Sequence, residues 1–188
     1  MQRDVLIVEE DRRVRELFQH IFLGAGYKCR LAGDLEEGLE AFRESRPPLV
    51  ITDLRMPMAK GDKSERDAGI RLLLEIRHED PNVAVIVCTG GPEAKFLVES
   101  LKLGAYAFLV KPVNVDELLI TAARALERRQ LLVERRQYET ALKALCSALE
   151  VAKAGICTAT HSDRAVVASF FKAPEALLGE IRRKSGEL

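Results

Sequence analysis

The sequence predicts an α/β protein with a five-stranded parallel, doubly wound sheet, followed by an extended helix and a small α-helical tail. Short apolar segments alternate with amphipathic segments along the first two thirds of the 188 residues. Glycine and proline residues separate most of these segments, as is usual where helices and strands end. Three of the apolar segments are almost wholly apolar, so we expect them to lie in a sheet covered by helices on both faces.

The elements follow one another as five consecutive strand–helix units. The expected strands are the short apolar segments at 5–8, 28–32, 49–52, 83–88 and 107–110. The expected helices have apolar residues three or four positions apart, and they cover 14–23, 35–43, 70–77, 94–103 and a segment that begins near Val115. Gly24 and Gly26 follow the first helix, and Pro47 and Pro48 follow the second.

Composition narrows the class of protein. Hydrophobic residues make up 47% of the chain and charged residues 31%, which is ordinary for a globular protein with a core. The net charge of zero argues against nucleic-acid binding through a broad basic face. No apolar run approaches the roughly 18 residues that span a bilayer, and no signal sequence is expected. The four cysteines lie far apart, so we expect reduced thiols and a cytoplasmic protein.

Polar side chains stand at the carboxyl ends of the expected strands. In a doubly wound sheet, ligands bind beyond these ends. The first expected strand is followed by Glu9, Glu10 and Asp11. The third is followed by Asp53, the fourth by Thr89 and the fifth by Lys111. Because the strands are parallel, we expect these side chains to converge on one edge of the sheet.

The types of these residues suggest one chemistry. Clustered carboxylates repel one another unless a cation lies between them, and Mg²⁺ prefers such oxygen ligands. A lysine and a hydroxyl group beside the metal suit an anionic group such as phosphate. A carboxylate next to the metal could act as the nucleophile and form an acyl phosphate. The strand ends therefore predict a phosphoryl-transfer site that uses Mg²⁺.

Four segments carry a resemblance to a known family: VLIVEED (5–11), TDLRMPMAKG (52–61), VIVCTGG (85–91) and GAYAFLVKP (104–112). In this order they resemble the receiver domain of two-component response regulators, over residues 1–125. The resemblance implies a flavodoxin-like domain that a histidine kinase or a phosphotransfer protein phosphorylates on aspartate. It also implies a signalling switch that catalyses its own Mg²⁺-dependent phosphorylation and dephosphorylation, and not a conventional enzyme.

The resemblance gives a role to each candidate residue. Asp53 matches the phosphoacceptor, while Lys111 and Thr89 match the lysine and the hydroxyl that contact the phosphoryl group. Phe108 matches the aromatic residue whose side chain follows Thr89 in the switch, although it could simply be buried. An Asp at a strand end is often only a helix cap or a turn residue, so the combination matters more than Asp53 alone. The Lys111–Pro112 bond is expected to be cis.

The metal ligands depart from the pattern of the family. The resemblance assigns Mg²⁺ binding to Glu9, Glu10, Asp53 and the backbone carbonyl of Arg55. The acidic pair of the family is usually Asp-Asp or Glu-Asp, whereas here it is Glu-Glu. Glutamate has one more methylene group, and Mg²⁺ requires near-ideal octahedral geometry. We therefore expect weaker or rearranged Mg²⁺ binding, with Asp11 as a possible substitute ligand.

The segment after the third strand also departs from the pattern. The third helix is expected to begin near Ala68, which leaves the sequence AKGDKSERD (59–67) as an insertion beside Asp53. Its polar and charged composition predicts an exposed, mobile loop. Two interpretations remain open: a tolerated surface insertion, or a lid or partner-specific contact over the phosphorylation site.

Residues 126–188 are expected to form a helical extension, separate from the receiver domain at 1–125. No helix stop signal occurs between Asn114 and Gly155. The apolar residues there have the spacing of a helix seam: Leu119, Leu126 and Val133, then Tyr138, Leu142, Leu145, Leu149 and Ala152. The residues after Gly155 are too few for an independent core, so we favour a module for dimerisation or for docking an effector, with coiled-coil character.

The leading hypothesis is a response regulator that switches conformation on phosphorylation and controls protein contacts or oligomerisation through its helical C-terminus. The alternative is a DNA-binding transcriptional regulator with an atypical or truncated output domain, although no convincing helix-turn-helix supports DNA binding. A third hypothesis is a degenerate receiver that acts only as a scaffold. The expected partners are a histidine kinase or phosphotransfer protein, a second copy of the chain and an unidentified downstream protein, with no membrane.

Overall fold

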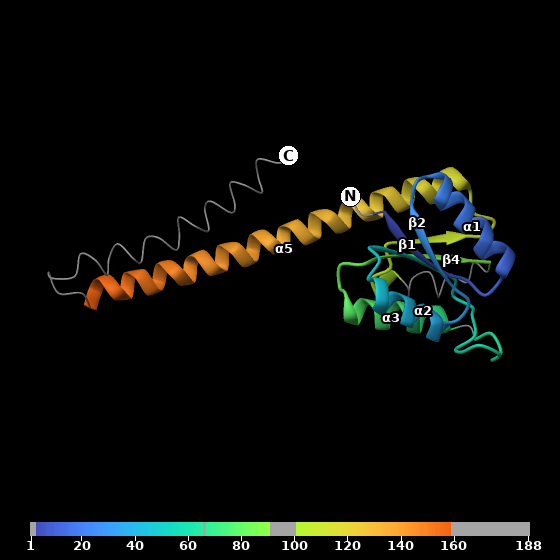
Figure 1. The fold of residues 1–188 in the computed structure, drawn as a ribbon, viewed down its shortest axis with the longest axis horizontal. Coiled ribbons are helices and arrows are strands. Elements are labelled where there is room, and N and C mark those ends of the chain that lie inside the picture. The colour runs from blue at the N-terminus through green and yellow to red at the C-terminus, as the bar shows by residue number, and fades with distance from the viewer. Residues whose placement is uncertain (1–2, 66, 91–100, 159–188) are drawn as a thin grey trace. The chain divides into compact units, whose positions relative to one another are not determined.

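The fold is a five-stranded parallel sheet with helices on both faces (Figure 1). The computed structural model describes residues 3–65, 67–90 and 101–158. In the order β2-β1-β3-β4-β5, the sheet is formed by β1 (Asp4–Val8), β2 (Lys28–Ala32), β3 (Leu49–Thr52), β4 (Ala84–Thr89) and β5 (Ala107–Val110). The helices with described bounds are α1 (Arg12–Gly24), α2 (Leu35–Ser45), α3 (Ala68–Glu79) and α5 (Val115–Thr158). The predicted doubly wound α/β fold is confirmed.

Some boundaries differ from the prediction for local reasons. Helix α1 begins at Arg12, because the Asp11 side chain accepts hydrogen bonds from the amides of Arg13 and Val14 and so caps the helix. Apolar periodicity could not detect this polar first turn. Strand β4 extends to Thr89, which pairs with Val110 of β5. The helix expected at 94–103 lies mostly outside the described residues, and the helical stretches expected after residue 158 lie wholly outside them.

The strands divide the core into two layers because successive side chains point to opposite faces. Val5 and Ile7 of β1 pack in the layer with α1 and α5, whereas Leu6 and Val8 pack in the layer with α2 and α3. Figure 1 shows these two pairs of helices on opposite sides of the sheet. Strands β3 and β4 are buried along their whole length, as predicted for strands covered on both faces. Each such Val, Leu or Ile contributes about 1.5–3 kcal/mol.

The first part of α5 belongs to the receiver core. The side chains of Leu118, Ala122, Ala125 and Leu126 are buried against the sheet. Contacts between residues divide the chain into two compact units, Met1–Leu132 and Val133–Leu188. The first unit thus reaches beyond residue 125 because one further turn of α5 packs on the sheet. The division of roles between 1–125 and 126–188 remains a prediction.

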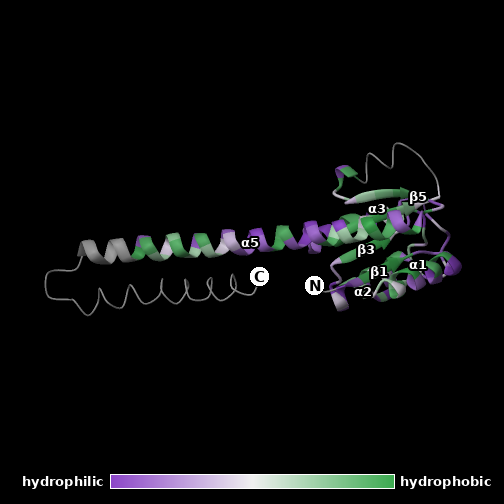
Figure 2. Cartoon of the chain, turned by 90° about the horizontal axis from the view of Figure 1, so that it is seen from above, coloured by the Kyte–Doolittle hydropathy of each residue, from purple (hydrophilic) through white to green (hydrophobic). Residues whose placement is uncertain are grey.

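The described part of the second unit is helical from residue 133 to 158. Tyr138, Leu142 and Leu149 are exposed in the single chain, with 53%, 59% and 50% of their surface accessible, and Leu145 is half-buried. Figure 2 shows apolar and polar residues interleaved along α5. In the same seven-residue pattern, Leu126 is buried in the receiver core, so the exposed seam begins only after it.

The insertion after β3 has local structure at its base. The backbones of Met56 and Glu65 form an antiparallel bridge, with N–O distances of 3.2 and 2.9 Å. Within the loop, the amide of Ala59 donates to Oδ2 of Asp62 at 3.2 Å. Helix α3 then starts at Ala68, which confirms the expected position of the helix after the insertion.

Three further features bear on the sequence predictions. The Lys111–Pro112 bond is cis, as the resemblance implied. Cys29, Cys88 and Cys146 are free thiols, and burial raises the pKa of Cys88 to about 12. Among the residues that the structure describes, no helix combines the length and the apolar character needed to cross a membrane.

Candidate functional site

The sheet places three ionisable residues at its carboxyl edge. The backbone ladder continues one residue past the ends of β1, β3 and β5. The amide of Glu9 donates to the carbonyl of Ala32 at 3.0 Å, and the amide of Asp53 donates to the carbonyl of Val8 at 3.1 Å. The amide of Lys111 donates to the carbonyl of Thr89 at 2.8 Å. The positions of all three side chains therefore follow from the pairing of the strands.

Lys111 joins two carboxylates at this edge. Its Nζ atom lies 2.5 Å from Oε2 of Glu9 and 2.5 Å from Oδ2 of Asp53. Glu9 is only 2% exposed and Asp53 only 8%. Charge-assisted hydrogen bonds in such surroundings are much stronger than at the surface. One ammonium faces two carboxylates, so the cluster has an excess negative charge when all three groups are ionised.

The buried cluster changes the pKa values of its members. Burial raises the pKa of Glu9, because removal from water disfavours the charged carboxylate, and the contact with Lys111 offsets this only in part. Burial acts to lower the pKa of Lys111, but the hydrogen bonds to Asp53 and Glu9 outweigh it and raise that pKa. Lys111 therefore stays cationic, and Glu9 takes up a proton more readily than an exposed glutamate.

Asp53 is held by the backbone that follows it. Its Oδ1 atom accepts hydrogen bonds from the amides of Leu54, at 2.5 Å, and Arg55, at 3.2 Å. With Oδ2 bound to Lys111, both carboxylate oxygens have partners. These contacts fix the orientation of the carboxylate, which is the requirement for a nucleophile that must meet a reacting atom in line.

Gly69 is a site residue that the sequence analysis missed. It lies in the first turn of α3, and its amide donates to the carbonyl of Leu54 at 3.0 Å. A Cβ atom at Gly69 would lie 2.0 Å from the carbonyl oxygen of Asp53 and 2.7 Å from Cα of Leu54. Only glycine allows α3 to approach the backbone of Asp53 this closely. A glycine inside the first turn of an expected helix was the available signal.

Arg15 is a second residue that the sequence analysis missed. Its Nη1 atom donates to the backbone carbonyl of Glu9 and lies 3.4 Å from the carbonyl of Glu10. A guanidinium from α1 thus holds the backbone that carries the acidic pair. Nothing in the sequence distinguishes Arg15 from the neighbouring arginines of the same helix.

The other acids after β1 lie outside the cluster around Lys111. Glu10 is exposed and lines a surface hollow with Arg15, Asp34 and Lys60. Asp11 caps α1, and its Oδ1 atom accepts from the amides of Arg13 and Val14. These two hydrogen bonds lower the pKa of Asp11.

Thr89 and Phe108 lie on neighbouring strands near the cluster. Thr89 is 3% exposed at the end of β4, and its carbonyl accepts the Lys111 amide. Phe108 of β5 is half-buried and packs against the core layer of α2 and α3. It pairs with Val87 in the ladder. The switch role of both residues remains a prediction.

The oxygen atoms around Asp53 are of the type that binds Mg²⁺. Glu9 and Asp53 each place a carboxylate oxygen against the same ammonium group, that of Lys111. The backbone of Arg55 lies beside them, because its amide donates to Oδ1 of Asp53. Mg²⁺ in proteins is typically bound by one or two carboxylates, with water or phosphate completing the shell. Within residues 3–65, 67–90 and 101–158, no group of three or more Asp, Glu, His or Cys side chains is arranged to hold a metal ion. Glu10 and Asp11 therefore do not join Glu9 and Asp53 in this arrangement.

The fold and this edge define a class of protein: an α/β domain that presents a buried aspartate, paired with lysine, at the carboxyl end of its central strand. The chain matches the description "Response regulator receiver domain" over residues 5–123. It therefore belongs to the receiver family of two-component response regulators, which are signalling switches, and the resemblance seen in the sequence is confirmed.

Known proteins with similar sequences include regulatory proteins. The regulatory protein AtoC of Escherichia coli is 32% identical over 138 residues, which cover 73% of this chain and 28% of AtoC. The nitrogen assimilation regulatory protein NtrX of Azorhizobium caulinodans is 33% identical over 73% of this chain and 29% of its own length. The chain thus spans less than a third of these relatives.

Solved structures confirm the fold. A receiver domain protein from Clostridium thermocellum superposes with a TM-score of 0.62 at 28% identity, covering 69% of this chain and 98% of that one. NtrX from Brucella abortus has a TM-score of 0.65 at 31% identity, covering 73% of this chain and 30% of NtrX.

Replacing Lys111 with Met is expected to lower the free energy of unfolding at pH 7 by about 2 kcal/mol, because two buried carboxylates lose their cation. Burial already raises the folded-state pKa of Glu9 above its unfolded value, and without Lys111, whose contact acts to lower it, that pKa rises further. Stability from such groups is present below the unfolded pKa, near 4, and is lost as the pH rises through the folded pKa. The deficit should therefore shrink between pH 7 and pH 5, measured by urea unfolding.

The matched control is Lys143→Met, which removes a lysine from an exposed position of α5. It should leave the free energy of unfolding close to the wild-type value at both pH values. A Lys111→Met deficit of the same size at pH 5 and pH 7 would contradict the assignment of the loss to unpaired carboxylates.

Proposed function

We propose that Asp53 accepts a phosphoryl group from a histidine kinase or a phosphotransfer protein, and that this modification controls protein contacts through the C-terminal helix. The observation that carries the proposal is the contact of Lys111 with both Glu9 and Asp53 at the edge of the sheet. This arrangement pairs a buried, oriented carboxylate with a cation that can neutralise a phosphoryl group.

The proposed transfer makes one bond and breaks one. A carboxylate oxygen of Asp53 attacks phosphorus, and the bond between phosphorus and the donor nitrogen breaks, so that the nitrogen leaves with the electron pair. The product is an acyl phosphate on Asp53. Bound Mg²⁺ supplies neutralisation of the charge on the phosphoryl oxygens. Lys111 exchanges one carboxylate partner for the phosphoryl group, and the hydroxyl of Thr89 donates to it.

The proposed switch uses residues whose strands are paired. Thr89 moves toward the phosphoryl group, and the side chain of Phe108 follows into the space that Thr89 leaves. The adjacent positions of β4 and β5 support this, because a shift at Thr89 is transmitted to a strand that it contacts directly. The insertion at 59–67 keeps its two interpretations, as a surface loop or as a contact for a partner beside Asp53.

Substitution of Asp53 by Asn should abolish phosphorylation by acetyl phosphate, since the amide nitrogen cannot replace the carboxylate nucleophile. The measurement is intact-protein mass spectrometry in the presence of Mg²⁺. Asp62→Asn is the control, because Asp62 is an exposed carboxylate of the inserted loop. Phosphorylation that persists in Asp53→Asn would show that another residue is the phosphoacceptor. A wild-type protein that is not phosphorylated would favour the hypothesis of a degenerate receiver.

Magnesium binding should depend most on Glu9. We propose that Glu9, Asp53 and the carbonyl of Arg55 hold Mg²⁺, and that the exposed Glu10 adds a weaker ligand. Glu9→Gln is expected to lower the affinity by about tenfold or more, since a charged oxygen ligand is lost. Glu10→Gln should cause a smaller loss because its side chain must first be ordered. Isothermal titration calorimetry measures both.

Asp11→Asn tests whether Asp11 is a substitute ligand. Asparagine is an equally good helix cap, so α1 should be preserved. If the cap is the whole role of Asp11, the Mg²⁺ affinity should stay at the wild-type value, and a loss would show that Asp11 binds the metal. Wild-type affinity in Glu9→Gln would contradict the proposed ligand set.

We propose that the helical C-terminus forms a homodimer. The support is the exposed seam of Tyr138, Leu142 and Leu149, at spacings that place them on one side of α5. Burial of each leucine against a second helix contributes about 1.5–3 kcal/mol. The double substitution of Leu142 and Leu149 by Ser should therefore give a monomer, measured by light scattering after gel filtration.

Lys143→Ser is the control for this substitution, because Lys143 is exposed on the same helix but lies outside the seam. The wild type and this control should have the mass of a dimer. A wild-type monomer would exclude the dimer, and a dimer that survives both leucine substitutions would place the interface elsewhere.

DNA-binding transcriptional control is the second candidate function. It is favoured by the names of relatives such as the transcriptional regulatory protein ZraR of Klebsiella oxytoca, which is 35% identical over 69% of this chain. The match covers only 28% of ZraR, so its name describes a much longer protein than the part that is similar to this chain. An electrophoretic shift with genomic DNA fragments distinguishes it from control through protein contacts alone. Location in the cytoplasm remains a prediction from the sequence.

A further inference from the structure

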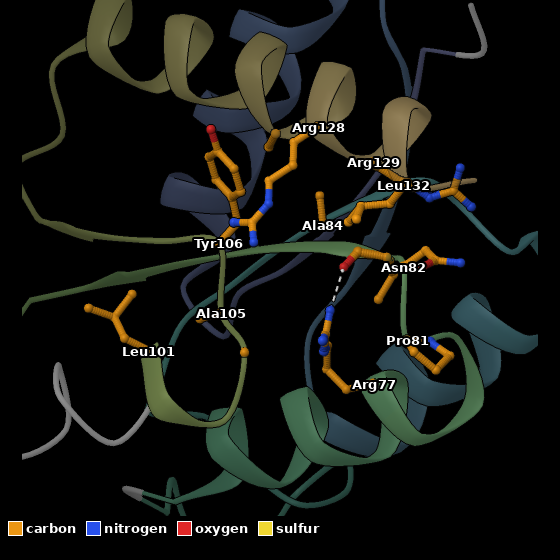
Figure 3. Close-up of a pocket in the computed structure, with 13 residues that line it drawn as sticks. Arg77, Pro81, Asn82, Ala84, Leu101, Ala105, Tyr106, Arg128, Arg129 and Leu132 are labelled. Atoms are coloured by element: carbon orange, nitrogen blue, oxygen red, sulfur yellow. Dashed lines mark hydrogen bonds between the residues drawn. The ribbon is translucent and has the colours of Figure 1, made fainter. Parts of the chain in front are cut away.

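A second cavity lies at the opposite end of the sheet from Asp53. Its volume is about 220 Å³. It is formed where β4 and β5 begin, between the end of α3 and the part of α5 in the first unit (Figure 3). The cavity is roughly seven times the volume that one water takes up in the liquid, which is room for a small ligand and not for a folded segment.

The lining of this cavity carries only positive charge. Arg77 comes from α3, and Arg128 and Arg129 come from α5, while none of the thirteen lining residues is acidic. In the part of the chain that the structure describes, one carboxylate forms an ion pair with these arginines: Asp80, at 3.2 Å from Nη2 of Arg129. Three guanidinium groups with one acidic partner leave an excess of positive charge around a concave space.

Arg129 has a donor without a partner. Its Nε atom is fully buried, and no hydrogen-bond acceptor contacts it in the structure. A buried donor that loses water without gaining a partner costs about 1–3 kcal/mol, so such groups usually have a ligand or an ordered water. Because the Nε atom is inaccessible, an anion in the cavity would contact the other N–H groups of Arg129 instead.

Arg77 is held in place at the cavity by its neighbours. Its Nη1 atom donates to the carbonyl of Val83 at 3.4 Å (Figure 3). Gly104, with φ of +95°, packs so closely that a Cβ atom would lie 2.9 Å from Nε of Arg77. The glycine both adopts the left-handed backbone conformation and leaves room for the guanidinium. The side chain is therefore positioned before any ligand arrives.

Tyr106 and Arg128 form the outer wall. The guanidinium carbon of Arg128 lies 5.7 Å from the centre of the Tyr106 ring, a cation–π contact that keeps the exposed arginine beside the cavity. Figure 3 shows the two side chains next to each other. A cation–π contact engages the charge of the guanidinium and not its hydrogen-bonding capacity, so N–H groups of Arg128 remain available to an acceptor.

We propose that this cavity binds a small oxyanion with at least two negative charges, of the phosphate or dicarboxylate class. Arginine N–H groups match the oxygen pairs of both kinds of anion. The three arginines come from two helices, so the anion would join α3 to α5 beside the start of β4. The site shares no residue with the cluster of Glu9, Asp53 and Lys111, and the proposal does not depend on phosphorylation of Asp53.

Isothermal titration of the full chain with inorganic phosphate, and separately with succinate, tests the proposal. The protein and buffers are freed of divalent cations on a chelating resin, so that Mg²⁺ cannot recruit phosphate to Asp53, and chloride keeps the ionic strength constant. We expect one of the two anions to bind with a stoichiometry of one, and the preference identifies the class. Absence of heat and of any thermal stabilisation with both anions would overturn the proposal.

Arg128→Gln and Arg77→Gln are each expected to weaken binding by about tenfold or more, because each removes charge-assisted hydrogen bonds to the anion. Arg124→Gln is the matched control, since Arg124 is exposed on α5 and does not line the cavity. Its affinity should stay within about twofold of wild type, because a surface charge outside the site contributes little. Equal affinities in all three variants, or an equal loss in all three, would show general charge attraction and contradict a site.

Gly104→Ala is a second test, which leaves all three arginines in the chain. The new methyl group should displace the Arg77 guanidinium and so weaken anion binding, while circular dichroism checks that the fold persists. Wild-type affinity in a folded Gly104→Ala protein would show that Arg77 does not contact the anion. Together with wild-type affinity in Arg77→Gln, it would overturn the proposed lining of the site.

Discussion

The contact between Lys111 and the carboxylates of Glu9 and Asp53 is the constraint on which the candidate site depends. Two buried carboxylates at close range repel each other, and one of them would take up a proton without a cation nearby. Lys111 supplies this cation, and its Nζ atom lies 2.5 Å from a carboxylate oxygen of each residue. A group that replaces this contact must itself supply the balance of charge. In the proposed function, Mg²⁺ would supply that positive charge when a phosphoryl group replaces the contact.

The geometry of the cluster comes from the parallel sheet and from two supports beside it. The backbones of Glu9, Asp53 and Lys111 are hydrogen-bonded to neighbouring strands, so their spacing is set by the strands. Arg15 holds the backbone behind Glu9, and Gly69 lets α3 close against the backbone of Asp53. These backbone contacts explain how the three ionisable side chains of the cluster are held in position.

The two ends of the sheet have opposite electrostatic character. The carboxyl ends of β1 and β3 lead into acidic residues, whereas the cavity at the start of β4 and β5 is lined by Arg77, Arg128 and Arg129. Both ends involve β4 and β5, because Thr89 is the last residue of β4 and Tyr106 directly precedes β5. An anion bound at one end and a phosphoryl group at the other would act on the same pair of strands.

The polar residues at the strand ends could be found without a structure. Buried strands produce apolar segments of recognisable length, so the residue after each one is apparent, and Asp53, Lys111 and Glu9 were assigned in this way. Helix starts were less accessible. Polar first turns carry no apolar period, and the start of α1 at Arg12 depends on the cap formed by Asp11.

The sequence by itself determined the order of the elements, the parallel sheet and the edge at which the acids and the lysine meet, because local apolar patterns and strand direction are encoded along the chain. Only the tertiary structure decided which acids join the cluster. Glu9 contacts Lys111 and Glu10 does not. The direction in which each of these adjacent side chains points depends on burial and on a partner 102 residues away in the sequence. The same holds for Gly69, whose role exists only because α3 packs against the backbone of Asp53.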